Sequence, residues 1–130
     1  MNGETDLNKL LRTISPSLDS GEYVFVSLSG KYGDYARLEP IGSFTEKEGL
    51  TLIVSAKTAR ENSLEFSEVF RMITLEVHSS LNAVGLTAAV AARLKDENIS
   101  ANVVAGYYHD HIFVQSRLAD KALEALKDLV

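Results

Sequence analysis

In the second half of the chain, the spacing of apolar residues is first that of a strand, then that of a helix, and then that of two strands and a helix. This order constrains the fold more than any other feature. Residues 71–77 alternate apolar and polar side chains, the spacing of a strand with one buried face. The Ala-rich segment 81–97 then repeats apolar residues at helical spacing. Segments 101–107 and 112–114 are predicted strands around a short turn, and Ser116 is predicted to cap a last helix. This half therefore runs strand, helix, strand, strand, helix.

That order makes up most of the split β-α-β pattern of ferredoxin-like folds. It predicts an α+β fold with an antiparallel sheet and helices on one face. A fourth strand is not evident near the C-terminus, because the chain ends at Val130. Two sources for it remain open: the first half lends a strand, or Leu129-Val130 begins a truncated one.

A looser series of elements occupies the first half. Asp6 is predicted to cap a helix that includes Ile14 and stops at Ser15-Pro16, because the residue before proline avoids helical backbone angles. Strands are predicted at 23–26 and 50–54, where β-branched and aromatic residues gather. Each half thus contains an earlier helix followed by a strand.

Parts of the two halves match at a constant offset. Segments 52–56 and 112–116 both lead from a strand into a helix, and Ala59 precedes Ala119 by the same 60 positions. Between the two strands of the first half, a loop is predicted at 29–35 and a short edge strand, broken by Pro40, at 37–44. We interpret the chain as a pseudo-duplicated pair of units, residues 1–68 and 69–130, packed as one body.

Charge and composition argue against several classes of partner. The net charge is -5, and the 13 Lys and Arg residues are scattered singly, which disfavours nucleic acid and anionic membranes. The N-terminus lacks the basic and apolar regions of a secretory signal, and the weakly polar run 83–92 is too short to span a bilayer. There is no cysteine, which fits a reducing cytoplasm. We therefore expect a cytoplasmic protein with no nucleic-acid and no membrane partner.

Particular runs in the second half resemble a known family. The run 83–94 resembles the start of the first helix in ACT domains, and 102–126 resembles the rest of such a domain. The string 77–87, together with 102–111, is similar to a family of small stand-alone bacterial proteins built from two ACT-like units. The first half fits that family more loosely. The resemblance implies an ACT-type βαββαβ fold, and a regulatory protein that binds a small molecule and catalyses nothing.

The same resemblance implies where a ligand binds. ACT domains typically bind amino acids between paired domains, so it implies an amino-acid ligand and a homo-oligomer, a dimer or tetramer. The ligand-contacting positions of the family fall here on Ser79, Ser80, Asn82, Val84, Gly85, Leu86, Asn102 and Val104. The loop departs from the commonest ACT pattern, because Ser-Ser-Leu-Asn-Ala-Val-Gly stands where many members have an acidic residue and Pro-Gly. The group that would meet a ligand ammonium is therefore absent from the loop.

Elementary physics agrees with this placement without requiring it. A helix N-terminus exposes backbone N–H groups and a partial positive charge, which favour a carboxylate. Gly85 has no side chain, so a ligand can approach its backbone closely. The alternative is structural: Ser79 or Ser80 caps the helix, and Gly85 permits tight packing.

The histidines form the second candidate feature. In a sheet of ferredoxin-like order, the end of the first strand lies beside the start of the third. His78, His109 and His111 are therefore expected on one rim, with Asp110 nearby, and we expect them to contact a ligand or to form structural hydrogen bonds. Three imidazoles near a carboxylate are also a possible zinc site, and solvated loop residues are a further alternative. Neither a cofactor nor a resident metal is expected.

The preferred function is a non-catalytic sensor of a small metabolite. No phosphate-binding loop or nucleophile elbow supports a common enzyme class, since Ser29-Gly30-Lys31 lacks the upstream glycine of a P-loop. Two alternatives stay open: a protein-interaction module without ligand, and a small metal-dependent enzyme that uses the histidine rim.

Overall fold

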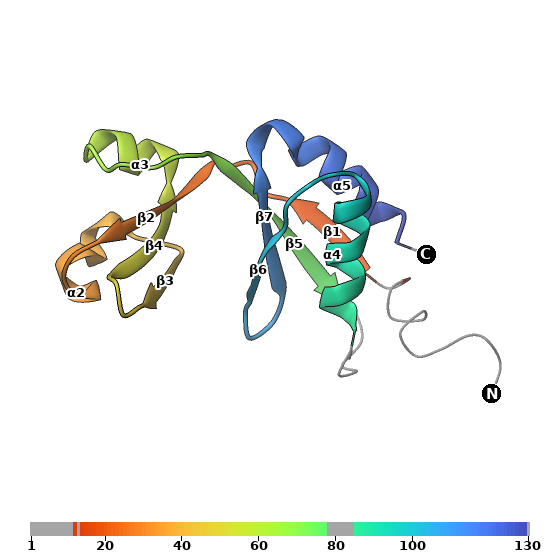
Figure 1. Ribbon diagram of the computed structural model, residues 1–130, viewed down its shortest axis with the longest axis horizontal. Coiled ribbons are helices and arrows are strands. Elements are labelled where there is room, and N and C mark those ends of the chain that lie inside the picture. Colours follow the sequence, from red (N-terminus) through yellow and green to blue (C-terminus); the bar gives the residue numbers. More distant parts are fainter. Residues whose placement is uncertain (1–11, 13, 78–84, 130) are drawn as a thin grey trace. The chain divides into compact units, whose positions relative to one another are not determined.

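The computed structural model describes residues 12, 14–77 and 85–129 (Figure 1). Contacts between residues divide the chain into two compact units. Residues 21–70 form one, called here the inserted unit, and the residues up to 20 together with those from 71 onward form the other, called here the flanking unit. The chain therefore starts in the flanking unit, builds the inserted unit and returns. The boundary at residue 68 and the packing of both units into one body stay predictions.

The inserted unit contains a small antiparallel sheet and three short helices. Its strands are β2 (Tyr23–Leu28), β3 (Gly42–Thr45) and β4 (Leu50–Ser55), in the order β3-β4-β2. Phe70 lies opposite Tyr23 on the far side of β2. The helices are α2 (Tyr32–Tyr35), the 3-10 helix η1 (Ala36–Leu38) and α3 (Ala56–Glu61). The core consists of Val24, Val26, Leu38, Leu50, Leu52, Val54, Ala56 and Ala59.

The flanking unit has a sheet in the order β1-β5-β7-β6. Its strands are β1 (Ile14–Leu18), β5 (Phe70–Val77), β6 (Asn102–Ala105) and β7 (Asp110–Gln115). Helices α4 (Leu86–Asp96) and α5 (Ala119–Lys127) pack on one face, with the 3-10 helix η2 (Ser116–Leu118) leading into α5 (Figure 1). Their shared core consists of Ile73, Leu75, Leu86, Val90, Leu94, Ile99, Ile112, Val114, Ala119, Ala122, Ala125 and Leu126.

The fourth strand of this sheet comes from the first half of the chain. β1 pairs antiparallel with β5, with Ile14 opposite Val77 and Leu18 opposite Ile73. The helix predicted before residue 15 lies almost entirely outside the described residues, but its inclusion of Ile14 is wrong. Pro16 is tolerated in β1 because this strand lies at the sheet edge, where a missing N–H breaks no ladder on the open side.

The repeat seen in the sequence is confirmed by the strands. β3 and β6 begin 60 positions apart, and so do β4 and β7. β3 and β4 form a hairpin that leads into α3, and β6 and β7 form the equivalent hairpin that leads into η2 and α5. The units differ in the connection before that hairpin. It comprises residues 29–41 in the inserted unit and 78–101 in the flanking unit, so the first has room only for α2 and η1. The fold is an α+β, tandem ACT-type arrangement.

Several local predictions need adjustment. The loop predicted at 29–35 contains the helical turn α2, and the strand predicted at 37–44 begins only at Gly42, after Pro40. Ser55 caps α3, since its Oγ accepts a hydrogen bond from the backbone N–H of Thr58 at 3.0 Å. Ser116 instead opens η2, and α5 starts after Leu118.

Candidate ligand-binding site

The candidate site is the rim of the flanking unit's sheet where β5 ends, α4 begins and the β6–β7 hairpin turns. Of the predicted ligand residues, His78, Ser79, Ser80, Asn82 and Val84 lie outside the described part of the chain. Gly85, Leu86, Asn102, Val104, His109 and His111 are described. The geometry below concerns these residues and their neighbours.

Gly85 opens α4 with left-handed backbone geometry. Its φ is 95°, and its carbonyl accepts the N–H of Ala89 at 2.9 Å, the first turn of the helix. Residues with a Cβ rarely adopt such an angle, so the turn itself accounts for the glycine. The side chain of Leu86 is 7% exposed in the core, so only its backbone faces the rim.

The β6–β7 hairpin separates core residues from residues on the open face. Val103 packs toward the helices and lies opposite the buried Ile112. The alternation of a strand puts Asn102 and Val104 on the other face, where Val104 lies opposite His111. The Asn102 amide donates to the carbonyl of Phe113 at 3.2 Å. The two predicted β6 residues therefore belong to the face that the helices leave open.

His111 connects this hairpin to β5. Its Nδ1 lies 2.9 Å from the hydroxyl oxygen of Thr74, on the open face of the sheet. The rings of His109 and His111 are 6.5 Å apart between centroids and nearly perpendicular. The Nδ1 of His109 is buried and has no hydrogen-bond partner within the described residues. Two of the three predicted histidines thus come together at the rim.

Gly106 makes this arrangement possible. A Cβ at this position would lie 2.8 Å from the carbonyl oxygen of His109 and 3.2 Å from Nε2 of His111. Its own N–H donates to that carbonyl at 2.9 Å and closes the turn. The absence of a side chain therefore lets the imidazole of His111 lie against the hairpin backbone.

Two further residues complete the open face and were not predicted as site residues. Thr74 is the hydrogen-bond partner of His111. Glu76 lies two residues further along β5. Glu76 is exposed and on the same face as Thr74. The alternation of residues 71–77 in the sequence predicted that Thr74 and Glu76 share the face away from the core, although neither was named as a site residue.

The described residues contain no group of three His, Cys, Asp or Glu side chains that could hold a metal ion. Zinc sites in proteins use at least three protein ligands. His109 and His111 by themselves fall short of that number, and His78 lies outside the described residues. The arrangement is better suited to hydrogen bonding, because imidazole, hydroxyl, amide and carboxylate groups share one face.

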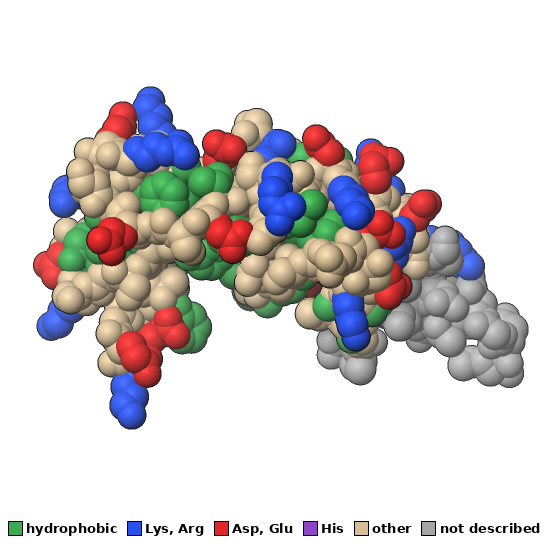
Figure 2. All heavy atoms as spheres, turned by 45° about the horizontal axis from the view of Figure 1, so that its top comes forward, with side chains coloured by type: hydrophobic (Ala, Val, Ile, Leu, Met, Phe, Trp, Pro, Cys, Tyr) green, Lys and Arg blue, Asp and Glu red, His purple; other side chains and the backbone are tan. Residues whose placement is uncertain are grey.

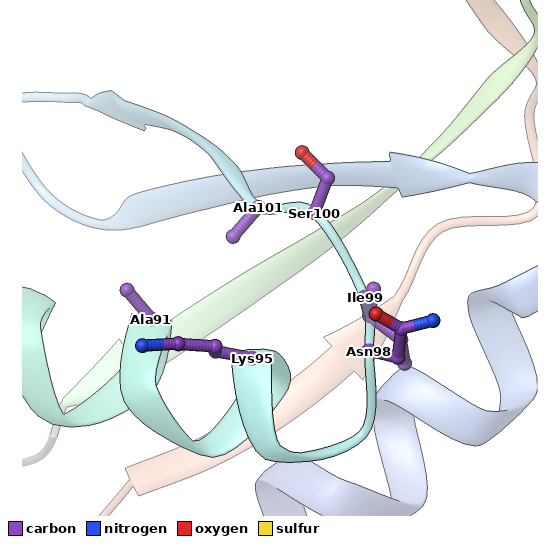
Figure 3. Close-up of a pocket in the computed structure, with 6 residues that line it drawn as sticks. All are labelled: Ala91, Lys95, Asn98, Ile99, Ser100 and Ala101. Carbon is purple, nitrogen blue, oxygen red and sulfur yellow. The ribbon is translucent and has the colours of Figure 1, made fainter.

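The flanking unit also has an open hollow at the other end of α4. It has a volume of about 490 Å³ and is lined by Ala91, Lys95, Asn98, Ile99, Ser100 and Ala101 (Figure 3). Figure 3 shows Ala91 and Lys95 on α4, and Ser100 and Ala101 on the segment that leads to β6. None of the predicted ligand residues lines this hollow.

Charges are mixed over the face of the molecule that Figure 2 shows. Figure 2 shows Lys and Arg side chains interspersed with Asp and Glu over the visible face, without a basic patch on that face. One ion pair shifts the pKa of its acidic partner: the hydrogen bond from Arg93, at 2.9 Å, lowers the pKa of the Glu97 carboxyl. No helix in the described part of the chain is long and apolar enough to cross a bilayer.

Comparison with known proteins identifies the class. An ACT domain family model matches residues 2–71, and a second ACT domain model matches residues 67–128. The chain belongs to the ACT domain family, as its strand order and tandem repeat indicate. No curated protein matches the sequence.

Solved structures with high and with low sequence identity to this chain share its fold. A protein of unknown function from Vibrio cholerae, described as a possible transport protein, is 53% identical, with a TM-score of 0.88 over 92% of both chains. A protein from Agrobacterium tumefaciens is 17% identical, with a TM-score of 0.69 over 89% of this chain and 88% of that one. A putative C-terminal regulatory domain of aspartate kinase from Porphyromonas gingivalis is 15% identical, with a TM-score of 0.59 over 88% and 95%.

Proposed function

We propose that the protein is a non-catalytic, cytoplasmic regulatory protein that binds a small molecule, specifically an amino acid, at the rim of the flanking unit. Its family supports the class, since ACT domains are typically regulatory. The observation that carries the proposal is the polar cluster of Thr74, His111 and His109 on the sheet face that the helices leave open. Such a cluster offers directional hydrogen bonds beside exposed apolar surface at Val104.

The same sheet face also carries an acidic group, which the predicted loop lacks. In this proposal Glu76 receives the ligand ammonium, because its carboxylate shares the open face with Thr74 and His111. The ligand carboxylate faces the first turn of α4, where backbone N–H groups and the helix dipole favour negative charge. The ammonium and the carboxylate of an amino acid are both bound in this arrangement.

The test is a ligand screen on wild type and two variants. Each of the twenty amino acids is added to the full chain, and the melting temperature and heat of binding are measured. A ligand at about 100 times its Kd stabilises the native state by ~2.7 kcal/mol. We expect His111→Gln and Glu76→Gln to lose that stabilisation, and Lys57→Gln, exposed on α3 of the inserted unit, to keep it.

Two outcomes would count against the proposal. If no amino acid changes the melting temperature, a protein-interaction module without ligand is favoured. If an amino acid binds both rim variants as tightly as wild type, its site is elsewhere. Metal analysis addresses the remaining alternative, because a metal-dependent enzyme at the histidine rim requires zinc, iron or manganese in the purified protein. The proposal includes a homo-oligomer, a dimer or tetramer, and excludes nucleic acid, membrane and cofactor as partners.

A further inference from the structure

An open hollow lies on the inserted unit, at the point where the chain leaves α3. It has a volume of about 570 Å³ and is lined by Leu64, Glu65, Phe66 and Ser67. Figure 1 shows the stretch between α3 and β5 as a connecting segment without helix or strand. The volume is within the range of ligand-binding pockets, ~300–1,000 Å³. The rim site of the proposed function belongs to the flanking unit, so this hollow is a separate surface.

The end of α3 holds the first apolar wall of the hollow in place. Ser63 adopts a left-handed φ of 55°, and its N–H donates to the carbonyl of Arg60 at 3.2 Å. The next N–H, that of Leu64, donates to the carbonyl of Ala59 at 2.9 Å. These two bonds form a Schellman motif, in which the residue after the left-handed position commonly packs on the helix. Leu64 accordingly packs against the core of the inserted unit and remains half-buried.

Phe66 forms the second apolar wall, and a cation lies over its ring. Its side chain also packs against the core and is half-buried. The guanidinium carbon of Arg60 lies 5.8 Å from the ring centroid, which is a cation–π contact. Leu64 and Phe66 thus present apolar surface that the inserted unit leaves partly open. Because both walls are already held, a partner that fills the hollow has little of this segment to order on binding.

Acidic side chains follow the same segment. Residues 61–70 contain Glu61, Glu65 and Glu68 and no Lys or Arg, and all three glutamates are exposed. Neither Glu61 nor Glu65 forms an ion pair within the described residues. The nearest cation along the chain, Arg60, lies over the ring of Phe66. The hollow therefore combines apolar walls with negative charge.

The backbone of the segment is open as well. In the part of the chain that the structure describes, residues 65–67 make no backbone hydrogen bond to other backbone groups. Each of these residues carries one N–H donor and one C=O acceptor. An extended peptide that lies along the segment can therefore form main-chain hydrogen bonds with it.

We propose that this hollow is a docking site for a basic, apolar peptide segment of a partner protein. An aliphatic side chain of the partner fills the space between Leu64 and Phe66, and its neighbouring Lys or Arg side chains face Glu61 and Glu65. Pockets for alternate side chains and complementary charge are common means of peptide recognition. Docking at this hollow needs no bound amino acid, so it can fail while the ligand proposal stands, and the reverse.

Charge distinguishes a basic peptide from other occupants. A second copy of the chain, related by a twofold axis, would place the acidic segment against itself. Nucleic acid and anionic lipid would meet the same repulsion from Glu61, Glu65 and Glu68. A basic peptide instead gains attraction at each of these carboxylates, in addition to the apolar contact.

The probe is the synthetic peptide acetyl-Lys-Leu-Lys-Leu-Lys-amide, added to the isotope-labelled full chain while amide NMR spectra are recorded. We expect the amide signals of residues 61–68 to shift and to saturate as peptide is added. Acetyl-Glu-Leu-Glu-Leu-Glu-amide keeps the leucines and reverses the charge, and acetyl-Lys-Ser-Lys-Ser-Lys-amide keeps the charge and removes the leucines. Each of these control peptides should bind at least about tenfold more weakly, because each lacks one of the two features of the partner.

A charge reversal in the protein tests the position of the site. Glu65→Lys should lower the affinity for the first peptide about tenfold, because it replaces an attraction with a repulsion. Glu48→Lys changes the net charge by the same amount in the exposed β3–β4 turn and should bind as wild type does. A circular dichroism spectrum of each variant checks that it is folded.

Several results would overturn the proposal. They are the absence of any shift, shifts centred outside residues 61–68, and equal binding of the serine peptide. Equal losses from Glu65→Lys and Glu48→Lys would also overturn it, because they would indicate attraction to net charge alone. Shifts of the same residues when the chain is concentrated without peptide would assign the hollow to a second copy instead.

Discussion

At the rim of the flanking unit, the position of the His111 side chain depends on close contacts with its neighbours. His111 is held by the Thr74 hydroxyl on one side and lies against the backbone of Gly106 on the other. Glycine is required there by proximity rather than by a left-handed angle, unlike Gly85, whose φ is 95°. The orientation of the imidazole therefore depends on Gly106 in its own hairpin and on Thr74, 37 positions before it in the sequence.

Gly106→Ala should destabilise the protein by ~1–3 kcal/mol, the usual cost of forcing an atom into a filled space. Its Cβ would meet the carbonyl of His109 at 2.8 Å, and backbone cannot move aside cheaply. The urea midpoint measures the change. Gly33→Ala is the matched control, because a Cβ there meets nothing within 4 Å, and it should leave stability equal or raise it by up to about 1 kcal/mol. Equal losses from both variants would contradict the packing argument.

At the scale of elements, α4 is terminated by backbone geometry and by charge. Asn98 adopts a left-handed φ of 61°, which asparagine tolerates better than most residues with a side chain. The N–H of Ile99 reaches the carbonyl of Leu94 at 2.9 Å, which satisfies a free helix carbonyl. Glu97 accepts a hydrogen bond from Arg93 and lies 3.9 Å from Lys121 of α5. The end of α4 is thus linked to α5.

We expect the Arg93–Glu97 pair to make a small contribution to the stability of the native state, and this contribution depends on pH. The pKa of Glu97 is lowered, first by its hydrogen bond with Arg93, so the pair stabilises the native state above the unfolded pKa of the carboxyl. That contribution is lost as the pH falls through the lowered pKa. Glu97→Gln should therefore be slightly less stable than wild type at pH 7 and equal to it in strong acid.

Urea midpoints of wild type and variant at pH 7 and in acid measure this difference. The effect is small because the side chains are 27% and 33% exposed and solvent screens the pair. Glu48→Gln, exposed in the β3–β4 turn, controls for the loss of one negative charge. A gap between Glu97→Gln and wild type that stays constant down to strong acid would argue against ionisation as its cause.

At the scale of the whole molecule, the flanking unit is discontinuous in sequence. β1 pairs with β5 along its full length, and Ile14 and Leu18 pack on the core that α4 and α5 cover. Full burial of such a side chain contributes roughly 1.5–3 kcal/mol, and Ile14 and Leu18, which are partly buried, each contribute a fraction of that to the 5–15 kcal/mol that stabilises a typical domain. The N-terminal strand is therefore part of the C-terminal ACT unit.

Removal of the inserted unit tests this architecture. The N–H of Asp19 donates to the carbonyl of Met72 at 2.9 Å, so a short Gly-Ser linker can replace residues 21–70. We expect the linked chain, residues 1–20 followed by 71–130, to give a dispersed NMR spectrum and a cooperative thermal transition. Residues 71–130 alone should give neither. A shorter chain that folds as stably as the linked one would show that β1 is dispensable.

The limits of sequence reasoning can be seen at particular residues. Periodicity predicted β5, β7 and the buried face of α4, and the ferredoxin-like strand order predicted that His109 and His111 share one rim. It missed the bond between Thr74 and His111, because that contact depends on strand register rather than on either local pattern. It also missed the constraint on Gly106, which arises only when the imidazole packs on the turn.

The sequence by itself determined those structural features that depend on residues close together along the chain. The cap at Ser55, the left-handed Asn98 and the alternation that buries Ile73 and Leu75 all follow from local chemistry. Only the tertiary structure decided which strand completes the second sheet. Ile14 and Val77 are brought together by a long-range pairing whose stability comes from the shared core, and no spacing in either segment reveals it.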